Sequence, residues 1–282
     1  MIPVITDIEE MRLWAKSKRL EGAGLGLVPT MGFLHKGHLS LVELALKKAD
    51  YVVVSIFVNP TQFGPGEDFN RYPRDLEEDA KKLEFMGAHV IFAPESAAMY
   101  PAGYSTYVAV DGVTEGLCGR SRPGHFRGVT TVVYKLFNIV MPDMAVFGQK
   151  DAQQLAVIRR MVRDLNMDIE IDAGPIIREN DGLAMSSRNR YLTEEERKQS
   201  AVLYRSLCAA EKLVKSGITN SHDIIKKVKE VIEKVPLAKI EYVEIVDIDD
   251  IKPVNDVSGG ALLAVAVCFG TTRLIDNMIL AN

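Results

Sequence analysis

Two histidines, His35 and His38, stand three residues apart at the start of a predicted helix. An apolar run enters this stretch at residues 25–28, a proline and a glycine bend the chain, and apolar residues at helical spacing follow from residue 39. The pattern predicts a strand, a tight turn and a helix. Backbone N–H groups at a helix start, together with the helix dipole, attract anions. Because the imidazoles are one turn apart, both can face one ligand, and we expect a phosphate site here.

Other interpretations of the two histidines remain open at this point. One of them could cap the helix, or both could form a surface pair or half of a metal site. No neighbouring cysteine or acidic residue completes a metal set, which disfavours the metal interpretation. Gly37 between them leaves room for a ring or a phosphate to approach closely.

A second polar turn follows residues 51–58, a nearly continuous apolar run typical of a parallel strand covered on both faces. Asn59 and Gln62 lie just beyond this run, where open α/β sheets bind their ligands. Asn-Pro is a good turn former, which would explain Asn59 without a ligand. Turn chemistry does not require Gln62, so we favour a substrate role for it.

A third polar turn follows the short predicted strand 144–147. Lys150 can neutralise phosphate, and Asp151 can cap the next helix or accept hydrogen bonds from ribose hydroxyls. Gln154 follows one helical turn later on the same side. A simple N-cap is the alternative for Asp151, but a second phosphate-competent turn in one sheet favours a site.

Two basic loops complete the candidate set. Residues 120–128 hold three arginines and His125, and a solvated loop and a cover for an anionic ligand explain them equally well. The segment Met185-Ser186-Ser187-Arg188 offers hydroxyls, backbone N–H groups and one cation, which can grip a triphosphate.

Composition excludes several classes of protein. The 282 residues are 47% hydrophobic, enough for one large or two ordinary globular domains. A net charge of -4 argues against a nucleic-acid partner, and no apolar run is long enough to span a membrane. Three widely spaced cysteines predict free thiols in a reducing cytoplasm.

The expected fold is an α/β parallel sheet with helices on both faces in residues 1–180, and a smaller α+β domain in 181–282 that begins with the Met-Ser-Ser-Arg loop. We also expect residues 104–110 to form an added strand or an edge hairpin.

The motifs resemble those of a known family. His-x-Gly-His after a strand is similar to the signature of the nucleotidyltransferase superfamily, which includes class I tRNA synthetases. The longer string Pro-Thr-Met-Gly-Phe-Leu-His-Lys-Gly-His-Leu-Ser-Leu at 29–41 resembles the pantothenate synthetase (pantoate-beta-alanine ligase) family. Four further blocks follow in that family's order, at residues 57–63, 122–129, 147–155 and 181–189.

The resemblance implies a Rossmann-like first domain and a defined reaction. An enzyme of this family condenses (R)-pantoate with beta-alanine using ATP and Mg2+, and releases AMP and pyrophosphate through a pantoyl-adenylate. It also implies a homodimer. The sequence itself identifies no magnesium ligand.

The same resemblance assigns roles residue by residue. The catalytic set would be His38, as proton donor toward pyrophosphate, with His35, Lys150 and Arg188 at the phosphates. Gln62 would bind pantoate and beta-alanine, and Gln154 would bind pantoate. Asn59 and Tyr72 are weaker beta-alanine candidates. ATP would contact Met31, Gly32, Phe33, Leu34, His35, Lys36, Gly37, His38, Gly148, Gln149, Lys150, Asp151, Ile177, Met185, Ser186, Ser187 and Arg188.

One residue departs from the family's pattern, because Gln149 stands where the family commonly has Glu. Two rival functions also remain. A related adenylyltransferase would keep the nucleotide on its product, but it would not need Gln62, Gln154 and an added domain. A nucleotide-binding sensor or scaffold would lack turnover, and the several polar blocks argue against it. Length and acidity disfavour a tRNA synthetase.

Overall fold

The computed structural model describes residues 1–281, which form two compact units. The first unit comprises residues 1–111, 121–149 and 157–175. The second comprises residues 112–120 and 150–156 together with the chain from Ile176 onward. The predicted domain boundary at residue 180 stays a prediction. In the structure, two short segments that precede this boundary, residues 112–120 and 150–156, cluster with the second unit.

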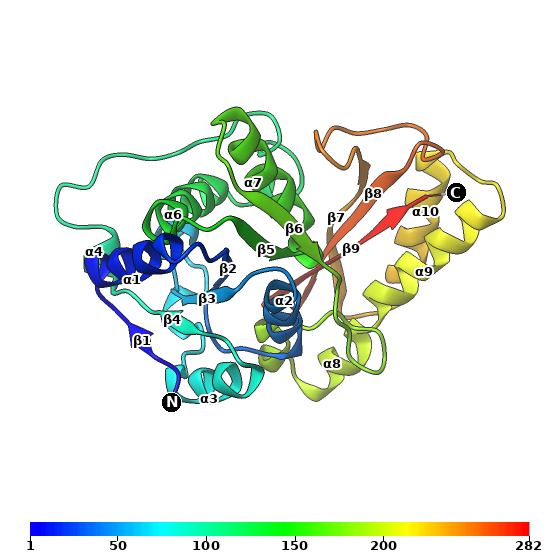
Figure 1. Cartoon of the computed structure of the whole chain (residues 1–282). Coiled ribbons are helices and arrows are strands. Elements are labelled where there is room, and N and C mark those ends of the chain that lie inside the picture. The colour runs from blue at the N-terminus through cyan, green and yellow to red at the C-terminus, as the bar shows by residue number, and fades with distance from the viewer. Residues whose placement is uncertain (282) are drawn as a thin grey trace. The chain divides into compact units, whose positions relative to one another are not determined.

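The first unit alternates strands and helices (Figure 1). In chain order it contains β1 (Val4–Ile5), α1 (Ile8–Leu20), β2 (Leu25–Thr30), α2 (Lys36–Leu46), β3 (Tyr51–Ile56), η1 (Pro60–Gln62), η2 (Phe69–Arg71), α3 (Leu76–Met86), β4 (Val90–Phe92), α4 (Ser96–Met99), α6 (His125–Val140), β5 (Met144–Gly148) and β6 (Glu170–Gly174). The connection from β5 to β6 consists of η3 (Gln149–Asp151) and α7 (Ala152–Asp164), and its residues 150–156 cluster with the second unit.

Within the described residues, the strands of the first unit form one parallel six-stranded sheet in the order β1-β4-β3-β2-β5-β6. β2 and β3 lie at its centre, where Leu27, Val28 and Val53 are completely buried. Helices α1 and α6 pack together on one face, and α2 and α3 pack together on the other (Figure 1). This arrangement explains why the central strands read as continuous apolar runs. The predicted fold class is confirmed.

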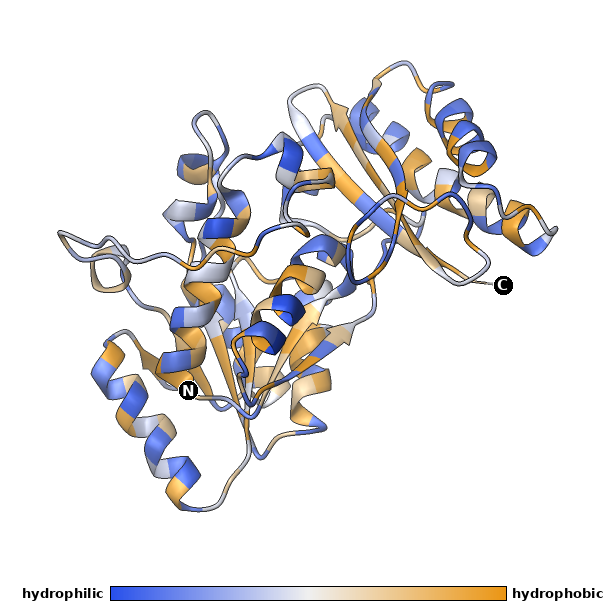
Figure 2. Cartoon of the chain, turned by 90° about the horizontal axis from the view of Figure 1, so that it is seen from above, coloured by the Kyte–Doolittle hydropathy of each residue, from blue (hydrophilic) through white to orange (hydrophobic). Residues whose placement is uncertain are grey.

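The second unit contains α5 (Leu117–Ser121), η4 (Ser187–Tyr191), α8 (Glu194–Ser200), α9 (Val202–Lys215), α10 (Ser221–Ile232), β7 (Ala238–Val246), β8 (Ala261–Phe269) and β9 (Thr272–Leu280). The three strands form an antiparallel sheet in the order β7-β8-β9 within the described chain. Its core joins α9 and α10 to the sheet through residues such as Leu207, Ile224 and Val265. The helices of both units are banded orange and blue in Figure 2, as expected for elements with one face against a core.

The expected strand or hairpin at residues 104–110 is wrong, because the structure has no strand there. The backbone N–H of Val108 donates to the Thr131 hydroxyl at 3.0 Å, and its carbonyl accepts from the Thr130 hydroxyl at 2.7 Å. Side chains of α6 therefore satisfy polar backbone groups that a neighbouring strand would otherwise pair.

None of the described helices has both the length and the apolar character needed to cross a bilayer. The three cysteines all lie in the described part of the chain, and none of them forms a disulfide.

Candidate active site

The turn between β2 and α2 is fixed by buried polar groups. The Thr30 hydroxyl donates to the Ser55 carbonyl at 2.8 Å and accepts from the Gly32 N–H at 3.1 Å. Gly32 has a φ of 80°, and a Cβ there would lie 2.9 Å from Ile56 and 3.2 Å from the Asp79 carboxylate. Glycine is therefore required at position 32 by both its backbone conformation and its neighbours.

Asp79 on α3 completes the turn from the neighbouring helix. Its carboxylate accepts from the backbone N–H of Phe33 at 2.6 Å and of Leu34 at 2.7 Å, and the residue is 1% exposed. Burial raises the pKa of Asp79, while the two N–H donors oppose that shift. Asp79 is not recognisable as a site residue from the sequence, because it lies in a helix rich in charged residues, where an acidic side chain is usually solvated.

The two predicted histidines lie together at the start of α2. Their rings are stacked, with centroids 4.0 Å apart and planes 26° apart. His35 is the N-cap, and its Nδ1 accepts from the Gly37 N–H at 3.1 Å. The Nδ1 of His38 accepts from the His35 N–H at 3.3 Å. Capping is thus a correct description of both rings.

These hydrogen bonds fix the tautomer of each neutral ring. Because each Nδ1 accepts a hydrogen bond, it carries no proton, and Nε2 is the protonated nitrogen. Each neutral imidazole then carries its proton on Nε2, and an N–H of this kind can donate to an anionic ligand. Capping and phosphate binding are therefore compatible.

In the Asn59–Gln62 turn, the buried side-chain amide of Asn59 contacts the more exposed side-chain amide of Gln62. Asn59 is 1% exposed, and its Nδ2 donates to Gln62 Oε1 and to the Gly128 carbonyl, each at 3.1 Å. Its Oδ1 accepts from the Tyr100 hydroxyl at 2.8 Å, and burial raises the pKa of Tyr100 to about 12, so this hydroxyl stays a donor at neutral pH. Asn59 therefore holds the Gln62 side chain in place through the hydrogen bond to its Oε1.

Gln62 also joins this turn to the histidine turn. Its Nε2 donates to the sulfur of Met31 at 3.1 Å, and a thioether is a weak acceptor. The predicted substrate amide and the predicted ATP turn are thus neighbours in the first unit. Tyr72, the weaker candidate, is 6% exposed, and its ring lies 6.1 Å from that of Phe63.

The second unit holds Lys150, Asp151 and Gln154. The Lys150 carbonyl accepts from Asn277 on β9 at 2.9 Å, and its ammonium lies 3.9 Å from the Asp151 carboxylate. The adjacent Gln153 is buried and bonds to the backbone of Cys118, Val113 and Gly116 at 2.9–3.0 Å. Of the two neighbouring glutamines, Gln153 is therefore structural, which leaves Gln154 as the site candidate.

The Met185–Arg188 segment is anchored from both sides. The Met185 N–H donates to the Ile177 carbonyl at 2.9 Å, and the Ser186 hydroxyl accepts from the Arg188 N–H at 3.3 Å as the N-cap of η4. Arg178 forms a bidentate ion pair with Asp276 of β9 at 2.6 and 3.0 Å. Both η4 and Lys150 contact β9, so β9 supports the two predicted cations of this unit.

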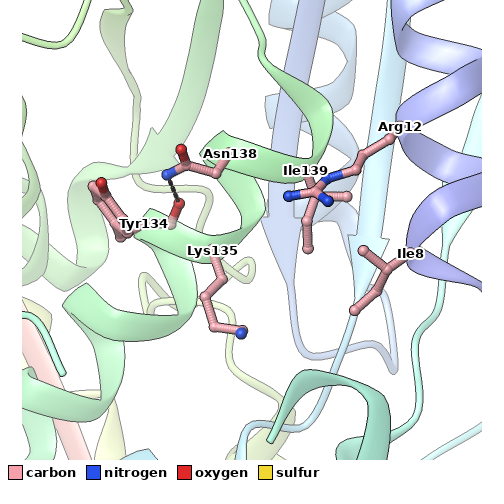
Figure 3. A pocket seen from close by; sticks show the side chains of 6 residues that line it. All are labelled: Ile8, Arg12, Tyr134, Lys135, Asn138 and Ile139. Carbon is pink, nitrogen blue, oxygen red and sulfur yellow. Dashed lines mark hydrogen bonds between the residues drawn. The ribbon is translucent and has the colours of Figure 1, made fainter. Parts of the chain in front are cut away.

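His35, His38 and Gln149 belong to the first unit, and Lys150 and Arg188 belong to the second. Their convergence on a single triphosphate stays a prediction. A separate pocket of about 300 Å³ lies between α1 and α6, lined by Ile8, Arg12, Tyr134, Lys135, Asn138 and Ile139 (Figure 3). None of the predicted site residues lines this pocket, so the pocket and the candidate site share no residue.

Comparison with known proteins agrees with this geometry. A parallel sheet in which a strand leads through a tight turn into a helix N-terminus is an arrangement at which α/β proteins bind nucleotides. The family model described as Pantoate-beta-alanine ligase matches residues 3–279. The chain belongs to the pantoate-beta-alanine ligase family, whose members are ATP-dependent ligases. This confirms the predicted family and disfavours the adenylyltransferase and scaffold alternatives.

Relatives match along almost the whole chain. The chain is 57% identical over 276 residues to pantothenate synthetase of Acetivibrio thermocellus, covering 98% of both proteins. It is 46% identical to the crystal structure of pantothenate synthetase from Thermus thermophilus, with a TM-score of 0.93 over 98% of this chain and 99% of that one. The corresponding ligase from Francisella tularensis, crystallised with beta-gamma ATP and beta-alanine, is 32% identical with a TM-score of 0.82, covering 99% and 98%.

Proposed function

We propose that this chain condenses (R)-pantoate with beta-alanine, consuming ATP and releasing AMP and pyrophosphate through a pantoyl-adenylate. The observation that carries the proposal is the pair of stacked imidazoles at the start of α2, next to the turn that Gln62 contacts through Met31. In this proposal His35 and His38 would donate to the phosphates and Gln62 would bind pantoate, and all three residues belong to the first unit. The Francisella relative, whose crystals hold a nucleotide and beta-alanine, supports the same pair of ligands.

The first step is attack of a pantoate carboxylate oxygen on the α-phosphorus of ATP. A bond from that oxygen to phosphorus forms, and the bond to the bridging oxygen breaks, so pyrophosphate leaves with the electron pair. Both reactants are anionic, so the protein must offset their repulsion and then the charge that moves onto pyrophosphate. The Nε2–H of His38 and of His35 can donate to those oxygens, and Lys150 and Arg188 supply the positive charge.

The second step is attack of the neutral beta-alanine amine on the acyl carbon. A C–N bond forms, the bond from the acyl carbon to the AMP oxygen breaks so that AMP leaves with the electron pair, and the proton lost by the amine nitrogen passes to solvent water. Gln62 and Gln154 would hold the pantoyl group through both steps, with Asn59 and Tyr72 near the amine. Closure of the Met185–Arg188 segment would keep water from the activated acid.

Magnesium enters the proposal as part of the substrate. Among the described residues, no three His, Cys, Asp or Glu side chains form a group that could hold a metal ion. Mg2+ is usually bound by one or two carboxylates together with substrate phosphates and water, so a dedicated protein cage is not required. We therefore propose MgATP as the nucleotide substrate, and the ATP phosphates as its principal magnesium ligands.

The proposal extends to the assembly, because symmetric homodimers are the commonest soluble oligomers. Light scattering coupled to size-exclusion chromatography would give twice the chain mass for a homodimer.

Product analysis tests the reaction itself, with ATP, pantoate and beta-alanine each omitted in turn. AMP and pantothenate should form only in the complete mixture, whereas a product that keeps the nucleotide would contradict the proposal.

A further inference from the structure

The backbone carbonyl of Gln62 is held by a line of side chains that starts at Glu67. The Glu67 carboxylate accepts from Arg122 Nε at 2.7 Å and from Nη2 at 2.6 Å. Arg122 Nη1 lies 3.0 Å from His125 Nε2, and His125 Nδ1 lies 2.8 Å from the Gln62 carbonyl. Arg122 Nη2 also reaches this carbonyl at 3.4 Å. All four residues belong to the first unit.

The hydrogen-bond directions along this line are determined. A carbonyl can only accept, so His125 Nδ1 carries the proton and donates to Gln62. Nε2 of the neutral ring is then a hydrogen-bond acceptor. The Arg122 guanidinium can only donate, so Arg122 Nη1 donates this hydrogen bond to Nε2. Arg122 therefore fixes the tautomer that His125 needs in order to hold Gln62.

The ion pair makes this line rigid. The side chains of Arg122 and Glu67 are 15% and 26% exposed, so solvent screens the pair less than an exposed one. Two guanidinium nitrogens face one carboxylate, and the planar group then fixes the direction of the third nitrogen. A lysine would preserve the charge but could not make these three contacts in one plane.

Gln62 is held from a second side as well. Its Oε1 accepts from Asn59, which is bonded in turn to the Gly128 carbonyl on α6. A Cβ on Gly128 would overlap the Thr61 backbone, so α6 and η1 are in direct contact at that position. With both its backbone and side-chain oxygens held, the direction of the Gln62 NH2 group is set, and this is the group that can donate to a substrate carboxylate or hydroxyl.

We propose that Arg122 and His125 are positioning residues of the ligation reaction, which act through the Gln62 carbonyl, with Glu67 fixing the guanidinium. The inference rests on the proposed function, because it takes Gln62 as a binder of pantoate. The predicted basic loop at 120–128 is only partly a loop, because α6 begins at His125. The inference gives Arg122 and His125 in this segment a specific task beyond that of a solvated loop.

The test compares four variants, Arg122→Lys, Glu67→Gln, His125→Asn and His125→Ala, with a matched control by steady-state kinetics. Arg122→Lys keeps the charge and removes the planar fork, Glu67→Gln is isosteric and removes the ion pair, and His125→Asn keeps a donor near the Nδ1 position. Arg163→Lys changes an exposed arginine of the same unit that pairs with its neighbour Asp164. This control should leave every kinetic constant at its wild-type value.

Arg122→Lys should raise the KM for pantoate by about tenfold, because a displaced positioning group weakens substrate alignment. Glu67→Gln should raise the KM for pantoate less than Arg122→Lys does. His125→Asn should raise it less than His125→Ala does. The KM for ATP should stay within about twofold of wild type in all of these variants. A purely structural role would instead lower Tm and affect all substrates alike. If Arg122→Lys does not fold, Glu67→Gln alone decides between these outcomes.

A second measurement is independent of activity. Nitrogen-15 chemical shifts of the His125 ring should report the neutral form protonated at Nδ1 in the wild type and loss of that preference in Arg122→Lys. A wild-type KM for pantoate in both Arg122→Lys and Glu67→Gln, or a ring protonated at Nε2, would overturn the inference. Absence of pantothenate formation by the wild type would instead refute the proposed function, so the two failures are distinguishable.

Discussion

Asp79 on α3 binds the backbone N–H of Phe33 at 2.6 Å and thereby shapes the turn that leads into the histidines of α2. Phe33 has a φ of 53°, in the left-handed region that a bulky side chain rarely adopts. Such a conformation persists only where its surroundings enforce it, and Asp79 supplies that constraint through both of its oxygens. The candidate ATP site thus depends on a carboxylate 41 residues after His38.

We expect Asp79→Asn to destabilise the protein and weaken ATP binding. An amide accepts through only one oxygen, so its NH2 group would face one of the two backbone N–H donors. An unsatisfied buried donor costs about 1–3 kcal/mol. Urea unfolding and the KM for ATP measure both effects, with Asp75→Asn as the control, because Asn still caps α3. Equal behaviour of the two variants would contradict this role for Asp79.

We expect His38→Ala and Lys150→Ala to slow adenylate formation far more than they affect stability. Each removes a group that would stabilise charge moving onto pyrophosphate, a loss of about 3 kcal/mol, or roughly a hundredfold in rate. Rapid-quench measurement of the first turnover isolates this step. Lys47→Ala, which removes an exposed lysine paired with Glu43, serves as the control. Adenylation at wild-type speed in both variants would count against the assigned roles.

The Glu67–Arg122 pair predicts a dependence of stability on pH. Burial acts to raise the pKa of Glu67, but the Arg122 hydrogen bonds and charge outweigh it and hold that pKa below the ordinary value of 4.5. For a lowered folded-state pKa, the added stability is complete above the unfolded pKa and is lost as the pH falls through the folded value. The difference in unfolding free energy between wild type and Glu67→Gln should therefore be constant near neutrality and shrink below pH 4.5. A difference that grows with acidification would exclude this pair as its source.

We expect Asp276→Asn to be strongly destabilising, because the Asp276 side chain is fully buried beside Arg178. Removing one charge of a buried pair leaves the other uncompensated and costs about 3–5 kcal/mol. The segment from Ile177 to Met185 should also lose order, since Arg178 ties it to β9. Asp164→Asn, which removes an exposed pair with Arg163, should change stability by less than about 1 kcal/mol. Chemical denaturation of both variants tests the contrast.

The sequence predicted those features that depend on local patterns. The apolar runs at β2 and β3 and the helical spacing after His38 identified the parallel sheet and the turn that carries the histidines. β9 was missed, because Asp276 and Asn277 interrupt its apolar pattern with buried polar side chains. Their partners, Arg178 and the Lys150 carbonyl, are remote in the chain. Local periodicity cannot report such tertiary pairing.

The supporting residues of the site were missed for a related reason. Glu67, Asp79 and Tyr100 act through partners 41 or more residues away, and each has a side chain that is ordinary on a solvated surface. Gln62 was identified because turn chemistry did not require it, whereas its support from Asn59, Arg122 and His125 became visible only in three dimensions. The residue roles themselves stay predictions until the variants are measured.

Exchange of labelled pyrophosphate into ATP tests the central claim most directly, because it reports reversible formation of an adenylate before the amine arrives. With wild-type enzyme, exchange should require pantoate and Mg2+, proceed without beta-alanine, and fall by about a hundredfold in His38→Ala. Exchange that is absent until beta-alanine is added, or that is unchanged in His38→Ala, would contradict the account.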